Sequence, residues 1–277
     1  MSPEIIVNRK DNLMNLSSEF RTVKLLGIDI FAMRMEEILS LCEKTIDNKS
    51  KLLLGVVNVA KIVKSKNDEQ LRNSLNEVDV VLADGQGIVW LSKLIGKPLP
   101  ERVAGIDIMY RLLECASKKK YGVYFLGAKS EVVKKVVDIV KVDYPGASVA
   151  GYRDGYFDES EEKDVAEEIK KSSADIIFVA IPTPIKENFL GKWRDYINVP
   201  VCHGVGGSFD IVAGVTKRAP LWMQNWGLEW FYRLVQEPRR MWRRYLVTNS
   251  IFVFLSISEI ARVRLKNLTS KLNWKNP

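Results

Sequence analysis

Polar side chains that could do chemistry directly follow several apolar segments of this chain. Asp84 is the strongest candidate, because it ends the apolar run VVLA and precedes Gly85 and Gly87. A carboxylate at the mouth of a buried strand could act as a general base. The same carboxylate could instead cap a helix that begins near Gly87, and its position alone favours neither role.

Other polar residues occupy equivalent places, each just beyond an apolar segment. They are Asn58, Thr183, Lys186, Glu187 and Asp210. Ligands of a parallel α/β sheet bind where the carboxyl ends of the strands meet. We therefore expect these residues to line one site together with Asp84.

Two glycine turns could bring the backbone close to a phosphate or a base. Gly127 ends the apolar segment 121–128, and Gly206 lies in GVGGSFD. Neither turn is the G-x-G-x-x-G of a dinucleotide site, and no acidic residue follows GVGGSFD at the required ~20 positions in a new strand. His203, the only histidine, ends an apolar strand, where a histidine more often has a structural role.

The sequence contains no Asp-x-Asp pair and no cluster of cysteine and histidine. A carboxylate-held metal or a structural zinc is therefore not expected, nor is any other cofactor. The three cysteines are far apart in apolar contexts, which indicates buried thiols in a reducing compartment. If the protein handles a nucleotide diphosphate, arginine must replace the metal.

The positive charge is concentrated at the C-terminal end. Residues 217–277 hold 12 Lys/Arg, 3 Asp/Glu and five of the seven tryptophans, whereas residues 1–216 have a net charge of −1. Such a tail fits an anionic surface or an anionic ligand. Arg233, Arg240, Arg243 and Arg244 could converge on a diphosphate. The alternative is a solvated or membrane-facing basic stripe, because tryptophan and leucine lie between these arginines.

Short apolar segments alternate with amphipathic ones from residue 22 to 216. The pattern predicts a strand pair at 23–31 with a turn at Gly27, and a strand at 51–57 that leads into a lysine-rich helix. Further strands are predicted at 78–85, 121–128, 147–152, 174–181 and 199–206. Helices are predicted at 33–48, 87–96, 106–120, 130–143, 159–172 and 186–196. This alternation indicates a Rossmann-like α/β fold with a mostly parallel sheet and helices on both faces.

The two ends of the chain differ from this pattern. Residues 1–20 are polar and aperiodic, and we expect residues 1–21 to form a flexible segment. The start has no basic region followed by an apolar core, so we do not expect a signal peptide. Residues 217–277 predict a helical appendage, with helices at 220–236, at 238–248 and at 251–268. Its longest apolar run, 251–257, is far shorter than the ~20 residues that span a bilayer. We therefore expect the appendage to sit on a membrane without crossing it.

Several sequence blocks, in order, resemble the WecG/TagA/CpsF glycosyltransferases, glycosyltransferase family 26. They are LADGQGIVW, PLPERVAGID, the FLGA and GYRDGYF turns, GVGGSFDIVAGVTKRAP and GLEWFYRLVQEPRRMWRRYL. The resemblance runs from about residue 25 to 246. It implies an inverting, metal-independent enzyme that moves a sugar from a UDP-sugar to a polyprenyl-diphosphate-linked saccharide. It also implies work on the cytoplasmic membrane face, in the synthesis of teichoic acid or exopolysaccharide.

The resemblance assigns roles to particular residues. Asp84 matches the proposed base and Arg102 the arginine of the ERVxG motif, and we expect both to be catalytic. Tyr156 and Asp210 match residues near the nucleoside. The tail arginines proposed to close over the diphosphates match Arg233, Arg240 and Arg243. We expect the donor to be bound by Tyr156 and Asp210 together with Asn58, Gly127, Lys186, Glu187 and Gly206.

Two positions depart from the family pattern. Lys186 stands where a glutamine is typical, and Val57 precedes Asn58 where a threonine is common. Both positions flank the sugar pocket that the resemblance implies. The transferred sugar therefore stays open between N-acetylmannosamine, glucose and a uronic acid, and so does the oligomeric state, monomer or homo-oligomer.

Two other classes of protein share parts of this pattern. A nucleic-acid-binding protein would explain the tail of arginine and tryptophan, but not Asp84, the glycine turns or the neutral body. A nicotinamide-dependent dehydrogenase would explain the α/β alternation, but the dinucleotide fingerprint is missing.

Overall fold

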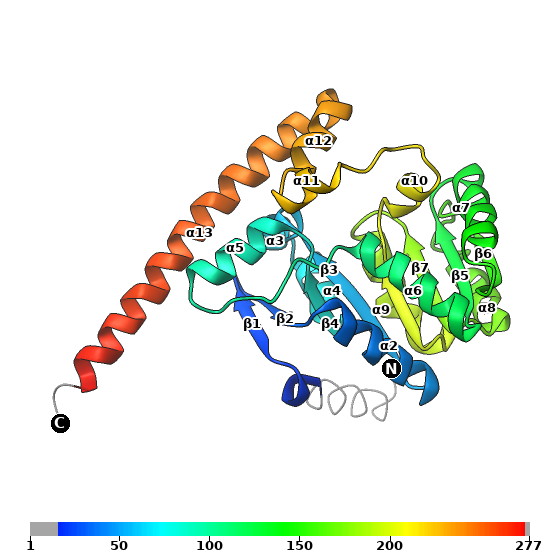
Figure 1. Ribbon diagram of the computed structural model, residues 1–277, viewed down its shortest axis with the longest axis horizontal. Coiled ribbons are helices and arrows are strands. Elements are labelled where there is room, and N and C mark those ends of the chain that lie inside the picture. The colour runs from blue at the N-terminus through cyan, green and yellow to red at the C-terminus, as the bar shows by residue number, and fades with distance from the viewer. Residues whose placement is uncertain (1–15, 275–277) are drawn as a thin grey trace.

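The computed structural model describes residues 16–274, apart from the side chains of Arg240 and of residues 267–274. Its centre is a six-stranded sheet in the order β4-β3-β8-β7-β5-β6, with every neighbouring pair parallel. The strands are β3 (Leu52–Val57), β4 (Val80–Ala83), β5 (Gly122–Gly127), β6 (Ser148–Arg153), β7 (Ile176–Ala180) and β8 (Val201–Gly204). The predicted α/β fold with a parallel sheet is confirmed (Figure 1).

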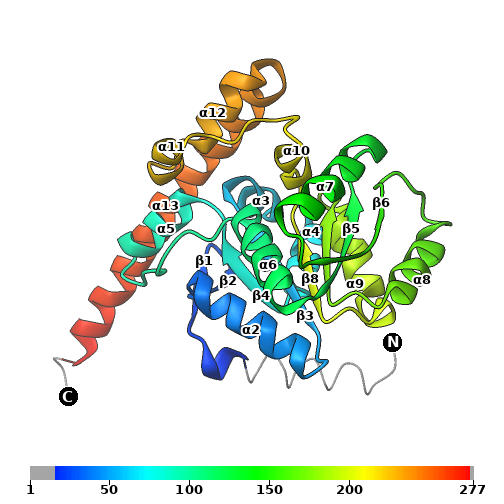
Figure 2. The same ribbon diagram turned by 45° about the vertical axis from the view of Figure 1, so that its right-hand side comes forward.

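Helices cover both faces of the sheet, as predicted (Figures 1 and 2). One face packs against α2 (Met35–Asp47), α6 (Gly105–Lys119), α7 (Ser130–Asp143) and α10 (Ser208–Val212). The other packs against α3 (Val59–Ser65), α4 (Glu69–Asn76), α5 (Gln86–Leu94), α8 (Glu162–Ser172) and α9 (Ile185–Ile197). Each helix buries an apolar stripe at helical spacing, and α7 does so with five valines.

A small antiparallel hairpin precedes the sheet. Its strands are β1 (Thr22–Leu25) and β2 (Ile28–Phe31), as the sequence predicted for 23–31. Leu26 and Gly27 have φ angles of 50° and 87°, the left-handed pair that a two-residue hairpin turn requires. Residues 16–19 form a single helical turn, in which Leu16 is buried.

The appendage is helical, but its helices differ from the predicted ones. They are α11 (Leu221–Asn225), α12 (Glu229–Gln236) and α13 (Pro238–Trp274). The single helix predicted for 220–236 is wrong, because the backbone turns at Gly227, where φ is 68°. The break predicted near residue 250 is also wrong, since no glycine or proline lies between Pro238 and Trp274.

The long helix α13 runs beside the body and extends past it (Figure 1). It packs against α3, Phe252 belongs to the apolar core on that face of the sheet, and Glu259 is buried as well. Within the described chain, Met241–Lys266 is long and apolar enough to cross a membrane by length and composition, with a hydropathy of 1.5. The expectation that no segment reaches spanning length is therefore wrong, because the apolar run 251–257 belongs to a longer continuous helix.

Candidate active site

The carboxyl ends of the six strands form one edge, and the chain leaves the neighbouring strands β3 and β8 toward opposite faces of the sheet. The chain continues from β3 into α3 on one face, whereas after β8 it continues into α10 on the other. Since β3 and β8 are neighbours, the chain diverges between these two connections, and this is the place where parallel α/β sheets bind ligands. Asn58 and Gly206 lie in these two connections.

Asp84 lies at this edge, immediately after β4. Its backbone N–H donates to the Val57 carbonyl oxygen at 2.8 Å, which continues the ladder between β4 and β3. Helix α5 begins at Gln86, and Gly85 is its N-cap residue without a side-chain cap. The helix-capping alternative for Asp84 is therefore not supported, and its carboxylate remains available for chemistry.

The surroundings of Asp84 make its carboxyl group a weaker acid than usual. Burial, and then the negative charge of Glu229, raise the pKa of Asp84 to about 6. The positive charges of Arg102, Arg233 and Lys61 act in the opposite direction. The group is therefore mostly ionised near pH 7 and is able to accept a proton there.

This pKa predicts the pH dependence of turnover. A base must be deprotonated, so kcat/KM should rise with pH through about 6 and level off above it, with roughly a tenfold loss one unit below. Initial rates between pH 5 and 8, with folding followed by circular dichroism at each pH, measure this. A flat profile from pH 5 to 7 in a folded protein would argue against Asp84 as the base.

A cluster of two arginines and two carboxylates lies next to Asp84. Arg102 Nη1 contacts Glu229 Oε2, and Arg102 Nη2 lies 3.6 Å from Asp107 Oδ2. Arg218 forms a bidentate pair with Asp107, at 2.6 Å and 2.9 Å. Glu229 belongs to α12, so this cluster joins the appendage to the body.

A second cluster, which is nearly buried, lies at the ends of β3 and β7. Glu187 Oε1 accepts hydrogen bonds from Lys61 Nζ at 2.9 Å and from Thr183 Oγ1 at 3.1 Å. The same oxygen lies 3.3 Å from Lys186 Nζ. Burial and the charge of Lys61 lower the pKa of Lys186 to about 8, whereas the two ammonium groups hold the pKa of Glu187 at about 2 despite its burial. Glu187 Oε2 is buried without a hydrogen-bond partner.

Three further predicted residues shape the backbone at the same edge. Asn58 is the N-cap of α3, and its Oδ1 accepts from the Lys61 N–H at 3.0 Å. Gly127 has a φ of 124°, and a Cβ there would lie 2.5 Å from the Ala180 carbonyl carbon, so only glycine fits. Gly206 has a φ of 55° and open space where a Cβ would be.

Three further body residues that the sequence analysis considered, Tyr156, Asp210 and His203, differ in how far they are buried. Tyr156 is exposed, and its backbone N–H donates to Asp154 Oδ1. Asp210 is half-buried in α10, with no ion pair or side-chain hydrogen bond found in the described part of the chain. His203 is fully buried between the carbonyl oxygens of Leu54 and Gly105, and burial lowers its pKa to about 4. This environment fits a structural histidine.

The tail arginines lie on two helices. Arg233 is on α12 and exposed, yet near enough to lower the pKa of Asp84. Arg243 is exposed on α13, and no contact among the described side chains links it to Asp84. Arg240 is also on α13, but its side chain lies outside the described part. The structure thus brings Arg102 and Arg233 to the site and leaves Arg243 apart.

Sequence reasoning missed four charged residues of the two clusters. They are Lys61, Asp107, Arg218 and Glu229. Lys61 follows Asn58 within one helical turn, a spacing that could have been noticed. Glu229 lies 127 residues from Arg102, so no local pattern could have paired them.

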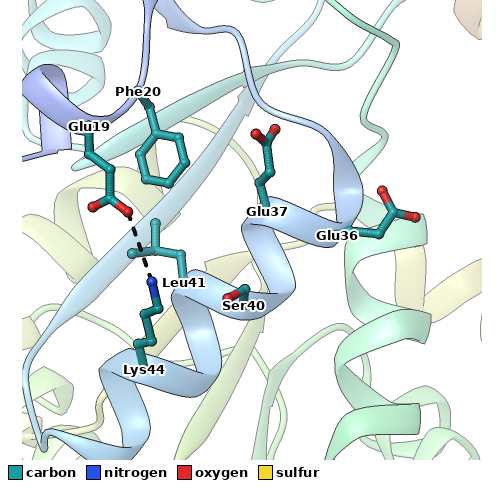
Figure 3. A pocket seen from close by; sticks show the side chains of 7 residues that line it. All are labelled: Glu19, Phe20, Glu36, Glu37, Ser40, Leu41 and Lys44. Atoms are coloured by element: carbon teal, nitrogen blue, oxygen red, sulfur yellow. Dashed lines mark ion pairs between the residues drawn. The ribbon is translucent and has the colours of Figure 1, made fainter.

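A separate cavity lies between residues 19–20 and α2 (Figure 3). Its volume is about 320 Å³, and its lining residues are Glu19, Phe20, Glu36, Glu37, Ser40, Leu41 and Lys44. Lys44 Nζ lies 3.9 Å from Glu19 Oε1. Three glutamates against one lysine make this an unsuitable site for a diphosphate, and none of the predicted site residues lines it.

A six-stranded parallel sheet with helices on both faces and charged side chains at its carboxyl edge is a Rossmann-like architecture. Residues 23–266 match the model of the glycosyl transferase WecG/TagA/CpsF family. The chain belongs to this family, and the predicted family and glycosyltransferase class are confirmed. The match extends about twenty residues further toward the C-terminus than the resemblance had indicated.

Relatives carry the name N-acetylglucosaminyldiphosphoundecaprenol N-acetyl-beta-D-mannosaminyltransferase. The Bacillus spizizenii enzyme is 45% identical over 172 residues, which are 62% of this chain and 66% of that enzyme. The Bacillus subtilis enzyme is 38% identical over 73% of this chain and 77% of its own length. The Staphylococcus aureus enzyme is 29% identical over 88% of this chain and 94% of its own length.

Proposed function

We propose that this protein is an inverting glycosyltransferase that moves a sugar from a UDP-sugar to a polyprenyl-diphosphate-linked saccharide. Asp84 carries the proposal, because its half-buried carboxylate stands at the sheet edge beside Arg102 and Arg233. The names of the relatives support N-acetylglucosaminyl-diphosphoundecaprenol as acceptor and N-acetylmannosamine as the first sugar to test. The pathway would then be the synthesis of a cell-surface polymer such as teichoic acid or exopolysaccharide.

The proposed reaction is a single displacement at the anomeric carbon. Asp84 takes the proton of the acceptor hydroxyl while that oxygen attacks the anomeric carbon from the face opposite UDP. The bond between the anomeric carbon and the UDP oxygen breaks, so the configuration inverts and UDP leaves as an anion. Arginine side chains and backbone amides of the glycine turns would stabilise that charge.

The cluster of Lys61, Lys186 and Glu187 is the proposed contact for the sugar. Glu187 Oε2 is a buried acceptor without a partner, so a sugar hydroxyl or amide N–H could donate to it. Asn58 and the turns at Gly127 and Gly206 would hold the rest of the donor, with Tyr156 and Asp210 near the nucleoside.

The direct test is a transfer assay. A panel of UDP-sugars, offered with a short-chain N-acetylglucosaminyl diphospholipid, should yield one disaccharide product of inverted configuration. Thermal shifts with UDP, NAD and single-stranded DNA separate the proposal from its rivals. Stabilisation by NAD or DNA alone, without UDP-sugar turnover, would reject it.

Metal removal is expected to leave the rate unchanged. Within the described residues, no group of three or more His, Cys, Asp and Glu side chains is placed to hold a metal ion. Arginine would supply the positive charge for the diphosphates. Initial rates with and without EDTA measure this, and a rate that collapses in EDTA and returns with Mg²⁺ or Mn²⁺ would contradict it.

We propose that the appendage holds the enzyme on the cytoplasmic membrane face. Large apolar side chains are exposed on α11, α12 and α13, among them Trp222, Phe231, Trp242, Phe254 and Ile257. Arg239, Arg243 and Arg244 are exposed near the start of α13, and each cation near an anionic surface contributes about 1 kcal/mol. Because Phe252 belongs to the apolar core of the body, we favour attachment along the helix over a crossing.

Phe254→Ser is expected to weaken binding to anionic vesicles by about 10- to 100-fold, since a buried phenylalanine contributes roughly 1.5–3 kcal/mol. Phe254 is 70% exposed, so the folded protein should lose little stability. Vesicle co-sedimentation measures the effect. Val142→Ser is the matched control, because Val142 is 77% exposed on α7 of the body. Equal vesicle binding by both variants would argue against attachment through α13.

A further inference from the structure

The arginines of the cluster beside Asp84 are more buried than the carboxylates that neutralise them. The side chains of Arg102 and Arg218 are 13% and 20% exposed, whereas those of Asp107 and Glu229 are both 32% exposed. The guanidinium groups therefore form an inner layer and the carboxylates an outer one. An outer carboxylate can be exchanged for another anion without moving the arginines.

Glu229 spans both arginines but satisfies only one of them. Its Oε2 contacts Arg102 Nη1, while its Oε1 lies 3.8 Å from Arg218 Nε, too far for a hydrogen bond. The Arg218 Nε–H is buried and has no hydrogen-bond partner. An anion with more oxygen atoms than a carboxylate could accept from both arginines at once.

The start of α6 adds to the attraction for an anion at this place. This helix has 15 residues, and its N-cap, Ala104, offers no side-chain acceptor to the first backbone N–H groups. Such groups favour a negative charge. Arg102 lies two residues before this N-cap, so a helix N-terminus and two guanidinium groups are present together.

We propose that Arg102 and Arg218 form a diphosphate-binding site. In the ligand-free protein the carboxylate of Glu229 occupies the place of the diphosphate. A diphosphate that enters the site displaces Glu229 and loosens α12 from the body. The position of the appendage then depends on whether the site is filled. The identity of the diphosphate, that of the UDP-sugar donor or that of the lipid acceptor, rests on the proposed function.

Isothermal titration of the full chain with inorganic diphosphate tests the site. Glu229→Gln should bind it about 10- to 100-fold more tightly, because a charge-assisted competitor is removed. Arg218→Gln should weaken binding by a similar factor. Glu114→Gln is the matched control: Glu114 also pairs with an arginine, Arg111, at 2.9 Å, but on the exposed side of α6, so diphosphate binding should not change. Unchanged or weaker binding by Glu229→Gln would overturn the proposal.

The same variants identify which diphosphate the site takes. If it takes the donor, Arg218→Gln should weaken binding of UDP and leave binding of a short-chain prenyl diphosphate unchanged; if it takes the acceptor, the pattern reverses. An Arg218→Gln variant that binds both ligands as the wild type does would overturn the proposal.

Loss of folding cannot imitate the main result, because Glu229→Gln is expected to gain affinity. Arg218→Lys keeps the positive charge but removes the planar guanidinium group that can donate two hydrogen bonds side by side. It should therefore weaken diphosphate binding less than Arg218→Gln does. The binding assay also needs no sugar transfer. Diphosphate binding that responds as stated, without turnover of any UDP-sugar, would reject the proposed function and keep the site. Turnover of a UDP-sugar by a protein whose diphosphate binding does not respond to these substitutions would keep the proposed function and reject the site.

Discussion

Asp84→Asn is expected to lower turnover by about 10²- to 10⁴-fold and to leave UDP binding nearly intact. The amide has the size and shape of the carboxylate but cannot take a proton from the acceptor hydroxyl. Asp84 has a pKa of about 6 and is therefore mostly ionised at neutral pH. Transfer to a soluble short-chain acceptor at saturating UDP-sugar measures the first effect, and titration with UDP the second.

A matched control separates loss of the base from a general loss of charge. Asp138 is exposed on α7 of the same body, so Asp138→Asn should retain the wild-type rate. A folded Asp84→Asn protein with near-normal transfer would eliminate Asp84 as the base. Loss of UDP binding together with turnover would instead assign Asp84 to donor binding.

Much of the body could be predicted from local sequence patterns. Apolar runs such as VVLA and IIFVA are long enough for strands and too short for helices, and amphipathic segments separate them. Because every strand of the central sheet runs parallel to its neighbours, the residues that follow the strands gather at one edge. This is why Asn58, Asp84 and Glu187 could be assigned to a common site before their contacts were known.

The appendage could not be predicted in the same way. Asn249 and Ser250 lie between the helices predicted at 238–248 and 251–268. They are weak helix formers, but neither prevents a helix from continuing, and α13 passes through both. The turn at Gly227 depends on close packing, since a Cβ there would lie 2.8 Å from Gln86 Cβ. The pairing of Glu229 with Arg102 likewise depends on how α12 docks, which is a tertiary property.

Arg233→Ala and Arg243→Ala are each expected to lower turnover of a soluble, short-chain acceptor by about 10- to 100-fold. A charge-assisted bond to a phosphate contributes roughly 1.5–3 kcal/mol, which corresponds to this range. The two residues lie on helices that pack together, with the rings of Trp230 and Tyr245 5.8 Å apart at their contact. Arg240, one helical turn before Arg243, is expected to behave in the same way.

The soluble acceptor is what makes this prediction decisive, because it removes the membrane from the assay. If the arginines only contact lipid, their loss should weaken vesicle binding and leave this rate unchanged. Arg264 is the control: it is exposed on the same helix, but about 30 Å further along than Arg243 at 1.5 Å per residue. Arg264→Ala should therefore keep the soluble rate. Arg233 already lowers the pKa of Asp84, so its effect should be the larger of the two. Wild-type rates for Arg233→Ala, Arg240→Ala and Arg243→Ala would confine the active site to the α/β body and leave the appendage as a membrane anchor.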